Sequence, residues 1–337
     1  LRPEFRSGAA THDALAISDA LEKLIDQKRD RAGDRAAAYD AVHMDALADF
    51  RSLAAIPDDF TVLFIGGGAS LQFAQVPMNL LAEGQTAGYL NTGAWGKKAL
   101  DDAVKVASVY EAWSGADGSF MRMPTTDEIE VRSDARYLHV TTNETIGGIR
   151  LPELPAADIP LVSDMSSDFL SRGIDWDVHD LVYGGAQKNL GPAGLAIVVV
   201  RRDRLSTHGR NLASYLDYAT HDANDSMANT PPMFAIYVMG KVLRWMKAEG
   251  GLGEFERRAA ERASLVYGAI DGSDGWYTSP VDEASRSHMN IVFRLPDEDL
   301  EKRFVAEAGD AGMVNLKGHR SVGGIRASVY NAMPVAS

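Results

Sequence analysis

Short apolar runs alternate with helical or glycine-rich segments along the middle of the chain, and this alternation constrains the fold most. A strand that is apolar on both sides has to be covered on both faces, and strands joined through helices run parallel. We therefore expect an α/β fold with a mostly parallel central sheet flanked by helices. The predicted strands lie near residues 61–65, 104–110, 137–141, 159–163, 181–183 and 195–200.

Two segments near the start of the chain have the periodicity of amphipathic helices. They cover residues 12–28 and 36–55. The densely charged residues 26–35 between them predict a solvated connection.

The C-terminal part of the chain has a different pattern. An amphipathic stretch over residues 231–270 leads to a strand-like segment over 289–294 and a glycine-rich segment over 318–327. At 337 residues, the chain exceeds the usual size of one domain. We predict a large domain over residues 1–250 and a smaller α+β domain over residues 251–337.

The charge and composition exclude several classes of protein. A formal net charge of −13 provides no basic surface for nucleic acid and disfavours binding to anionic membranes. The longest apolar run, residues 195–200, is too short to cross a bilayer. The chain has no cysteine for disulfides or thiolate metal sites, and its 8 histidines show no paired spacing. We expect a cytoplasmic protein without a metal, nucleic-acid or membrane partner.

One lysine follows a strand so closely that it should lie at the edge of the core. Lys188 comes shortly after residues 181–183, and Asp164 ends the strand predicted over 159–163. A buried ammonium is costly. Forming a Schiff base removes that charge, and an aspartate supplies the partner that a pyridinium nitrogen requires. The pair indicates pyridoxal phosphate, although a solvated lysine is the commoner case after a strand.

Three further segments have residues suited to such a cofactor. Gly66-Gly-Gly-Ala-Ser70 follows a strand and opens a helix, whose N-terminus binds phosphate well; a tight turn without a ligand is the alternative. Trp95 stands between glycines and can stack on a planar ring or pack in the core. Thr145 follows residues 137–141, where open α/β sheets bind ligands, or it serves only the turn.

A basic cluster near the C-terminus is a candidate anion site. It contains Lys317-Gly-His-Arg320 and Arg326, separated by glycines. Arg326 lies in a strand-like setting and can form a bidentate pair with a carboxylate, while His319 and Arg320 suit a phosphate. A solvated face is the alternative, which the interleaved glycines and the few acidic neighbours disfavour.

Together these segments resemble the phosphoserine aminotransferase family, class V members of the fold-type I pyridoxal phosphate enzymes. The resemblance covers residues 36–334 and implies the fold of that family. It rests on long ordered strings at residues 67–81, 91–95, 143–145, 164–167, 185–194, 229–232 and 318–334.

The resemblance implies a role for each candidate cofactor residue. Lys188 would form the Schiff base and transfer the proton, and Asp164 would hold the ring nitrogen. Trp95 would stack on the ring, and Thr145 would bond its 3-oxygen. The cofactor phosphate would be bound by Ala69, Ser70 and Gln187, and by Asn229 and Thr230 from the second subunit of a homodimer.

The resemblance also implies the reaction. An amino group would pass between glutamate and 3-phosphohydroxypyruvate, giving O-phosphoserine and 2-oxoglutarate in serine biosynthesis. In some bacteria the family also serves pyridoxine biosynthesis through 4-phosphohydroxythreonine. Arg326 would bind the α-carboxylate, and the substrate phosphate would be bound by His319, Arg320 and Arg35. The acidic chain can still hold such a pocket, because net charge does not determine a local field.

Both ends of the chain depart from the family pattern. Phe5-Arg-Ser-Gly-Ala9 lacks the proline of the family's opening segment, and Asp34-Arg35 aligns with a family His-Arg pair. Residues 1–35 are therefore a divergent N-terminal segment, and the missing C-terminal helix predicts a truncated small domain. A catalytically impaired cofactor-binding homologue is the alternative. The cationic string over residues 318–326 disfavours a third candidate, a class V transaminase for an unphosphorylated amino acid.

Overall fold

The computed structural model describes residues 32–207 and 209–337, with side chains from residue 38 onward. The helix expected over residues 12–28 and the segment Phe5-Arg-Ser-Gly-Ala9 lie outside the described residues, as do the side chains of Asp34 and Arg35.

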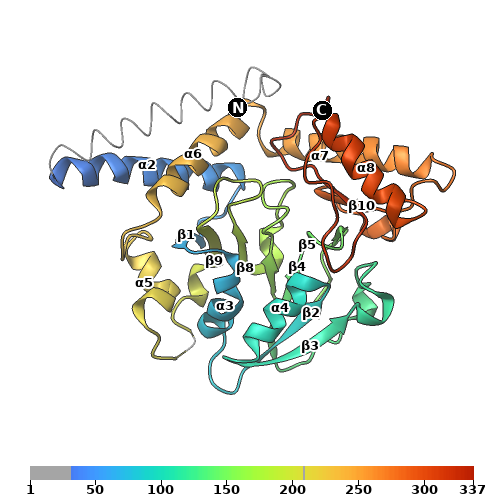
Figure 1. Cartoon of the computed structure of the whole chain (residues 1–337). Coiled ribbons are helices and arrows are strands. Elements are labelled where there is room, and N and C mark those ends of the chain that lie inside the picture. The colour runs from blue at the N-terminus through green and yellow to red at the C-terminus, as the bar shows by residue number, and fades with distance from the viewer. Residues whose placement is uncertain (1–31, 208) are drawn as a thin grey trace.

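A seven-stranded sheet forms the centre of the molecule, in the order β1-β9-β8-β7-β4-β2-β3 (Figure 1). Strand β9 is antiparallel to both of its neighbours, and the other pairs are parallel. The expected mostly parallel sheet is confirmed. The strands are β1 (Phe60–Gly66), β2 (Thr86–Asn91), β3 (Ser108–Ser114), β4 (Ala135–Thr141), β7 (Leu161–Asp164), β8 (His179–Gly185) and β9 (Leu195–Arg201).

Strand β2 is the element of the sheet that the sequence patterns did not predict. Its residues Thr86-Ala-Gly-Tyr-Leu-Asn91 include two polar ones, so they form no continuous apolar run, yet all are buried between β4 and β3. The strand expected over residues 104–110 begins at Ser108, because helix α4 (Ala94–Ala103) and a turn occupy the preceding residues.

Helices cover both faces of the sheet, and the alternation of side chains along β9 shows how. Ile197 and Val199 pack with α2 (Ala32–Leu53) and α6 (Met233–Ala248) in one hydrophobic cluster. Val198 and Val200 point the other way, into a cluster with α3 (Gln72–Leu80) and α4. Figure 1 shows α2 crossing α6 on one side of the sheet and α3 beside α4 on the other. The expected layers are confirmed.

Helix α2 corrects one expectation. It begins at Ala32, so the last part of the charged segment 26–35 is helical and not a connection. The alanines at 36–38 favour helix strongly and let it extend toward the N-terminus.

A smaller unit follows α6, at the right of Figure 1. It contains α7 (Leu252–Asp271), β10 (Asn290–Phe293), α8 (Glu298–Asp310) and β11 (Ile325–Ser328), with β10 and β11 antiparallel. The amphipathic stretch 231–270 is two helices, because Gly250 and Gly251 adopt φ values of +111° and +74° between them. The domain boundary near residue 250 stays a prediction.

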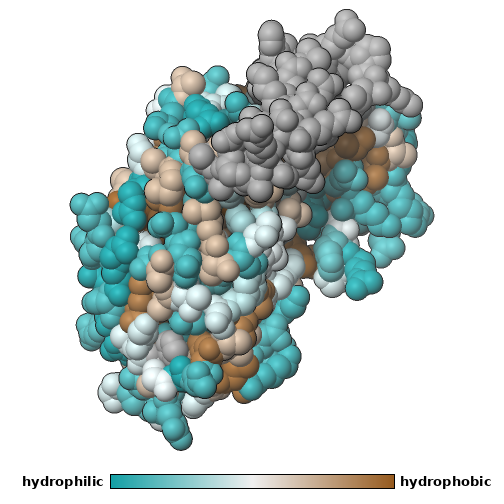
Figure 2. Space-filling model, turned by 90° about the vertical axis from the view of Figure 1, so that its left-hand side faces the viewer, coloured by the Kyte–Doolittle hydropathy of each residue, from teal (hydrophilic) through white to brown (hydrophobic). Residues whose placement is uncertain are grey.

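The remaining elements are short. They are β5 (Asn143–Glu144), β6 (Ile149–Arg150), α5 (Tyr218–Ala223) and the 3-10 helices η2 (Ala69–Leu71), η3 (Ala116–Gly118), η4 (Thr126–Glu128), η5 (Trp176–Val178), η6 (Arg202–Arg204), η7 (Ser214–Leu216) and η8 (Glu283–Ser285). On the face shown in Figure 2, hydrophobic residues lie in small groups among hydrophilic ones. Within the described residues, no helix combines the length and apolar character needed to cross a membrane.

Candidate active site

The candidate site lies where parallel strands β4, β7 and β8 end. Thr141 pairs with Asp164, which in turn pairs with Tyr183 of β8. Lys188 follows in the turn after β8. Because the carboxyl ends of parallel strands meet at one edge of a sheet, this topology brings the aspartate and the lysine to the same edge.

Lys188 is held in a partly buried position. Its Nζ donates to Thr145 Oγ1 at 2.5 Å and lies 5.9 Å from the centroid of the Trp95 ring. Burial lowers the pKa of Lys188, and the charge of Arg326 lowers it further, against the opposing effect of Asp164 and two other carboxylates. A lowered pKa makes the amine a better nucleophile and proton acceptor near neutral pH.

Asp164 is fixed at the end of β7. Its side chain is 4% exposed, and its Oδ1 accepts the backbone N–H of Ser166 at 2.9 Å. Its carbonyl oxygen accepts the backbone N–H of Thr142 at 3.1 Å. Burial raises the pKa of Asp164, while the bonds from Ser166 and the nearby Lys188 lower it. A rigid carboxylate of this kind can hold a cation such as a protonated ring nitrogen.

Trp95 lies in the first turn of α4, where a buried carboxylate holds the backbone. Glu144 accepts the N–H of Trp95 at 3.1 Å and that of Gly96 at 2.7 Å. The sequence reasoning gave Glu144 no role, although it precedes Thr145 in the matching string Asn143-Glu-Thr145. The indole Nε1 of Trp95 is buried and has no hydrogen-bond partner among the described residues.

The glycine turn after β1 leaves space beside the first turn of a helix. Gly67 has a φ of +108° and donates its N–H to Gly194 O at 3.0 Å, and no atom lies within 4 Å of a Cβ built on Gly67 or Gly68. The first N–H groups of the following turn, at Ala69 and Ser70, have no intrahelical acceptor. This turn, η2, contacts β8 and β9. The open, donor-rich turn suits a phosphate.

Three other predicted phosphate ligands lie at the surface. Gln187 is exposed in the turn that carries Lys188. Asn229 and Thr230 are exposed on the segment between α5 and α6. Only the backbone of Arg35, in α2, is described, so its predicted contact with the substrate phosphate stays a prediction.

The predicted substrate residues belong to the smaller unit. Arg326 lies in β11 opposite Val292, and its Nε is buried without a partner among the described residues. His319 is partly buried and Arg320 is exposed, on a loop closed by a 2.7 Å bond from Gly318 N–H to Gly324 O. The structure therefore brings Arg326 near Lys188 and leaves His319 and Arg320 on a neighbouring loop.

Tyr330 connects this strand to the lysine, and sequence reasoning missed it. Its hydroxyl makes a hydrogen bond with Thr145 and accepts one from Asn290 Nδ2 at 3.0 Å. Burial raises the pKa of Tyr330, while the bond from Asn290 and the charge of Arg326 lower it. Tyr330 lies within the string over residues 318–334 on which the family resemblance rests. The match of the whole string did not single out this residue or indicate its role.

Buried amides join the two units beside the lysine. Asn331 donates its N–H to Asn189 Oδ1 at 3.0 Å and its Nδ2 to Leu170 O at 2.7 Å. Asn143 Nδ2 reaches Asn290 Oδ1 at 3.0 Å. These contacts cross long stretches of sequence, so no local pattern could predict them.

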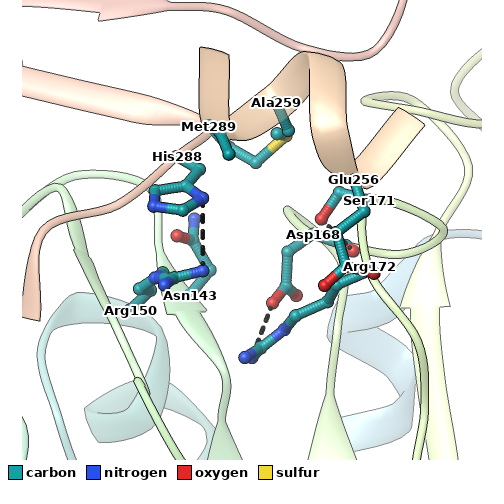
Figure 3. Close-up of a pocket in the computed structure, with 10 residues that line it drawn as sticks. Asn143, Arg150, Asp168, Ser171, Arg172, Glu256, Ala259, His288 and Met289 are labelled. Carbon is teal, nitrogen blue, oxygen red and sulfur yellow. Dashed lines mark hydrogen bonds and ion pairs between the residues drawn. The ribbon is translucent and has the colours of Figure 1, made fainter. Parts of the chain in front are cut away.

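A cavity of about 130 Å³ is lined by Asn143, Asp168 and residues of α7, among others (Figure 3). Arg172 pairs with Asp168 at 3.1 Å, and Arg150 donates to His288 Nδ1 at 3.3 Å. Burial, together with both arginines, lowers the pKa of His288 to about 4. Glu256 also lines the cavity, so two carboxylates balance the two guanidinium groups. The ionised side chains that line the cavity therefore carry no net charge.

The residues of the site fit pyridoxal phosphate. Among the residues that the structure describes, Trp95 Nε1 and Arg326 Nε are buried polar atoms without partners, and the space beside Gly67 and Gly68 is open. A lysine with a lowered pKa and a buried aspartate stand at the same sheet edge. Within the described residues, no group of three or more histidines and acidic residues could hold a metal ion.

Comparisons with known proteins agree with this arrangement. The family model of class-V aminotransferases matches residues 9–336. A phosphoserine aminotransferase of Niallia circulans is 48% identical over 339 residues, covering 99% of this chain and 94% of that protein. One of Laribacter hongkongensis is 50% identical over 294 residues, covering 87% and 82%.

Solved structures give the same result. The phosphoserine aminotransferase from Bacillus circulans subsp. alkalophilus superposes with a TM-score of 0.86 at 48% identity, covering 89% of this chain and 83% of that one. A phosphoserine aminotransferase from Trichomonas vaginalis, described as bound to PLP, gives 0.83 at 35% identity and covers 91% and 86%. The chain therefore belongs to the class-V aminotransferases, and within them to the phosphoserine aminotransferase family.

Proposed function

We propose that the protein is a pyridoxal phosphate-dependent phosphoserine aminotransferase. It exchanges an amino group between glutamate and 3-phosphohydroxypyruvate, giving O-phosphoserine and 2-oxoglutarate. The observation that carries the proposal is the contact of Lys188 with Thr145, beside Asp164 at the same sheet edge, in a chain that shares 48% of its residues with a phosphoserine aminotransferase.

The residues that would hold the cofactor are those predicted from the sequence. When bound, pyridoxal phosphate supplies a ring that accepts the electrons released as the substrate Cα–H bond breaks. Asp164 would keep the ring nitrogen protonated, and Trp95 would cover one face of the ring. The cofactor phosphate would be bound by Ala69, Ser70, Gln187, Asn229 and Thr230.

Lys188 would be the acid/base that carries the proton from the substrate Cα to the cofactor carbon bonded to the substrate nitrogen. For this task it has to be neutral at working pH, which its burial and the charge of Arg326 favour by lowering its pKa. Thr145 accepts a hydrogen bond from Nζ and so fixes the direction in which the amine points. Tyr330 contacts the same threonine and would limit access of water.

Cationic groups would select the substrate. Arg326 would bind the α-carboxylate, and His319, Arg320 and Arg35 would bind the phosphate. Charge-assisted hydrogen bonds contribute about 1.5–3 kcal/mol each, so a substrate without its phosphate should bind far more weakly. This cationic set also disfavours a transaminase for an unphosphorylated amino acid.

We propose a homodimer with a shared site. Asn229 and Thr230 are exposed in the single chain, which suits residues that contact the cofactor phosphate of a second subunit. Use of 4-phosphohydroxythreonine, the cytoplasmic location and the lack of nucleic-acid or membrane partners stay predictions.

The alternative of an impaired cofactor-binding homologue has no supporting observation. It rested on the expected lack of a C-terminal helix and on the divergent residues 1–35, including Asp34, none of whose side chains are described. The described catalytic candidates have the side chains that the reaction requires.

The first test is the absorption of the purified protein with pyridoxal phosphate, before and after glutamate is added. We expect a cofactor band that shifts with glutamate, and Lys188→Ala should abolish both the shift and turnover. Lys97→Ala is the matched control, because Lys97 is exposed and its ion pair within the described part of the chain is with Asp101, at 2.5 Å. A band that glutamate leaves unchanged, or turnover by Lys188→Ala, would contradict the proposal.

The second test concerns the substrate. We expect a kcat/KM for phosphohydroxypyruvate about tenfold to hundredfold above that for hydroxypyruvate for each phosphate contact. Arg320→Gln should reduce that ratio. Equal rates with both substrates would exclude the phosphate pocket.

A further inference from the structure

We propose that Glu144 is a positioning residue that fixes the Trp95 ring over the cofactor. It would act by holding the backbone of the first turn of α4 through its buried carboxylate. This inference rests on the proposed cofactor and names a residue that the reaction itself does not use.

The contacts of Glu144 converge on one short segment. Its carboxylate accepts the N–H of Trp95, with both oxygens at 3.1 Å, and the N–H of Gly96 at 2.7 Å. The Thr92 hydroxyl donates to it at 3.2 Å. Two of these donors are the free N–H groups of a helix N-terminus, where a negative charge is stabilised.

The segment is shaped around the carboxylate. Gly93 adopts a φ of +153°, and a Cβ there would lie 2.8 Å from Glu144 Cδ. A Cβ on Gly96 would lie 2.7 Å from Leu90 O and 3.4 Å from Glu144 Oε1. Gly93 therefore makes room for the carboxylate, and Gly96 makes room for both the carboxylate and the end of β2. The close approach of these groups fixes the position of Trp95 between them.

Glu144 also relates the tryptophan to the catalytic lysine. The next residue, Thr145, accepts the hydrogen bond from Lys188, whose Nζ lies 5.9 Å from the Trp95 ring centroid. The backbone of Glu144 is itself fixed, because its carbonyl accepts the N–H of Gly148 at 2.9 Å. The adjacent residues Glu144 and Thr145 thus fix the positions of the Trp95 ring and the Lys188 amine.

The cost of this carboxylate indicates a function. Glu144 is 1% exposed, and none of the ion pairs between described residues includes it. An unpaired buried charge is expensive, whereas an exposed Ser, Thr or Asp caps a helix cheaply. Burial raises the pKa of Glu144 to about 7, Asp164 contributes to the rise, and the bonds from Gly96, Trp95 and Thr92 oppose it. Capping the N-terminus of α4 would not by itself require a buried carboxylate.

The test replaces the carboxylate by its amide. In Glu144→Gln the side chain keeps its shape, but the negative charge is lost. One of the two oxygens that accept the Trp95 N–H also becomes an NH2 group, which cannot accept it. We expect the dissociation constant for pyridoxal phosphate to rise about tenfold to hundredfold, the effect of one lost charge-assisted bond. The circular dichroism of the bound cofactor should weaken, and the fluorescence of Trp95 in the cofactor-free protein, obtained by difference from Trp95→Phe, should change.

The matched control is Glu111→Gln. Glu111 is an exposed carboxylate on β3 that accepts from Asn91 Nδ2 at 2.8 Å, at the start of the same segment. This variant should leave cofactor affinity, dichroism and Trp95 fluorescence unchanged. If Glu144→Gln folds poorly, Thr92→Val removes a single donor, keeps the charge and should produce a smaller change in the same three signals.

A double-mutant cycle separates positioning from a general loss of structure. If Glu144 acts through the ring, Glu144→Gln should weaken cofactor binding much less in a Trp95→Ala background. Equal effects in both backgrounds, or a Glu144→Gln protein that matches Glu111→Gln, would overturn the inference. Failure of the wild-type protein to bind the cofactor would instead contradict the proposed function.

Discussion

At the scale of single residues, the site is organised by burial of ionisable groups. Lys188, Asp164 and Glu144 all lie at one sheet edge, and burial is the main cause of each pKa shift. For the lysine, burial favours the neutral amine that a nucleophile needs. For the carboxylates it raises the pKa, and hydrogen bonds keep them ordered.

The raised pKa of Glu144 predicts a dependence of stability on pH. Its folded pKa of about 7 exceeds the usual 4.5, so the folded protein binds the extra proton between these values. The carboxyl therefore destabilises the fold increasingly as pH rises from about 4.5 to about 7, by roughly 3 kcal/mol in total. Glu144→Gln should lack this trend. Urea unfolding of cofactor-free protein at several pH values measures it, and parallel pH curves for both proteins would contradict it.

At the scale of elements, the turn between β5 and β6 contacts the smaller unit. A Cβ on Gly148, whose φ is +70°, would lie 2.8 Å from Asn290 O and would overlap the Val292 side chain. The same turn begins at Thr145, directly after Glu144 at the end of β5. The closeness of this turn to β10 therefore sets the distance between the lysine and the strand pair that contains Arg326.

Two adjacent glycines in this turn should respond very differently to alanine. Gly148→Ala should destabilise the protein by about 2 kcal/mol or more, because it combines left-handed strain with overpacking. Gly147→Ala should cost under about 1 kcal/mol, since the nearest atom to its Cβ, Phe120 O, is 3.7 Å away. Thermal unfolding of the two variants measures the difference. Similar melting temperatures would show that β10 can shift to accommodate the added methyl group.

The elements show where sequence reasoning succeeds. Continuous apolar runs such as residues 195–200 predicted strands buried on both faces, because only burial on both sides favours that composition. Strand β2 was missed because polar Thr86 and Asn91 at its two ends leave only the short apolar run 87–90, and the burial of both residues depends on neighbouring strands. The break at Gly250 was missed because amphipathic helices lie on both sides of it, so the two patterns look like one stretch.

At the scale of the whole molecule, two units meet beside the lysine. Lys188 and Asp164 could be predicted from adjacent strands, since local pattern and topology place them. The links through Asn189, Asn331 and Tyr330 could not, because each joins residues far apart in the sequence. Long-range polar contacts depend on the packed structure and leave no periodic signal.

The amide link predicts that the units support each other. Asn331 is 3% exposed, and Asn331→Ala leaves Leu170 O without its 2.7 Å partner. We expect a loss of about 1–3 kcal/mol in stability. Alanine keeps the backbone N–H that donates to Asn189, but without the bond to Leu170 this backbone is held less firmly, so kcat should also fall because Asn189 lies next to Lys188. Asn224→Ala is the control, since its side chain caps only its own exposed helix turn. Unchanged kcat in Asn331→Ala would mean that the link is structural alone.

The bond between Asn331 and Asn189 also bears on the order of events during synthesis. The two residues lie 142 positions apart. Lys188, which precedes Asn189, therefore emerges from the ribosome well before Asn331. A nascent chain that has formed the central sheet still lacks β11 and Tyr330. Competence to handle a reactive aldehyde cofactor would therefore arise late, after Lys188 is already folded into the sheet edge.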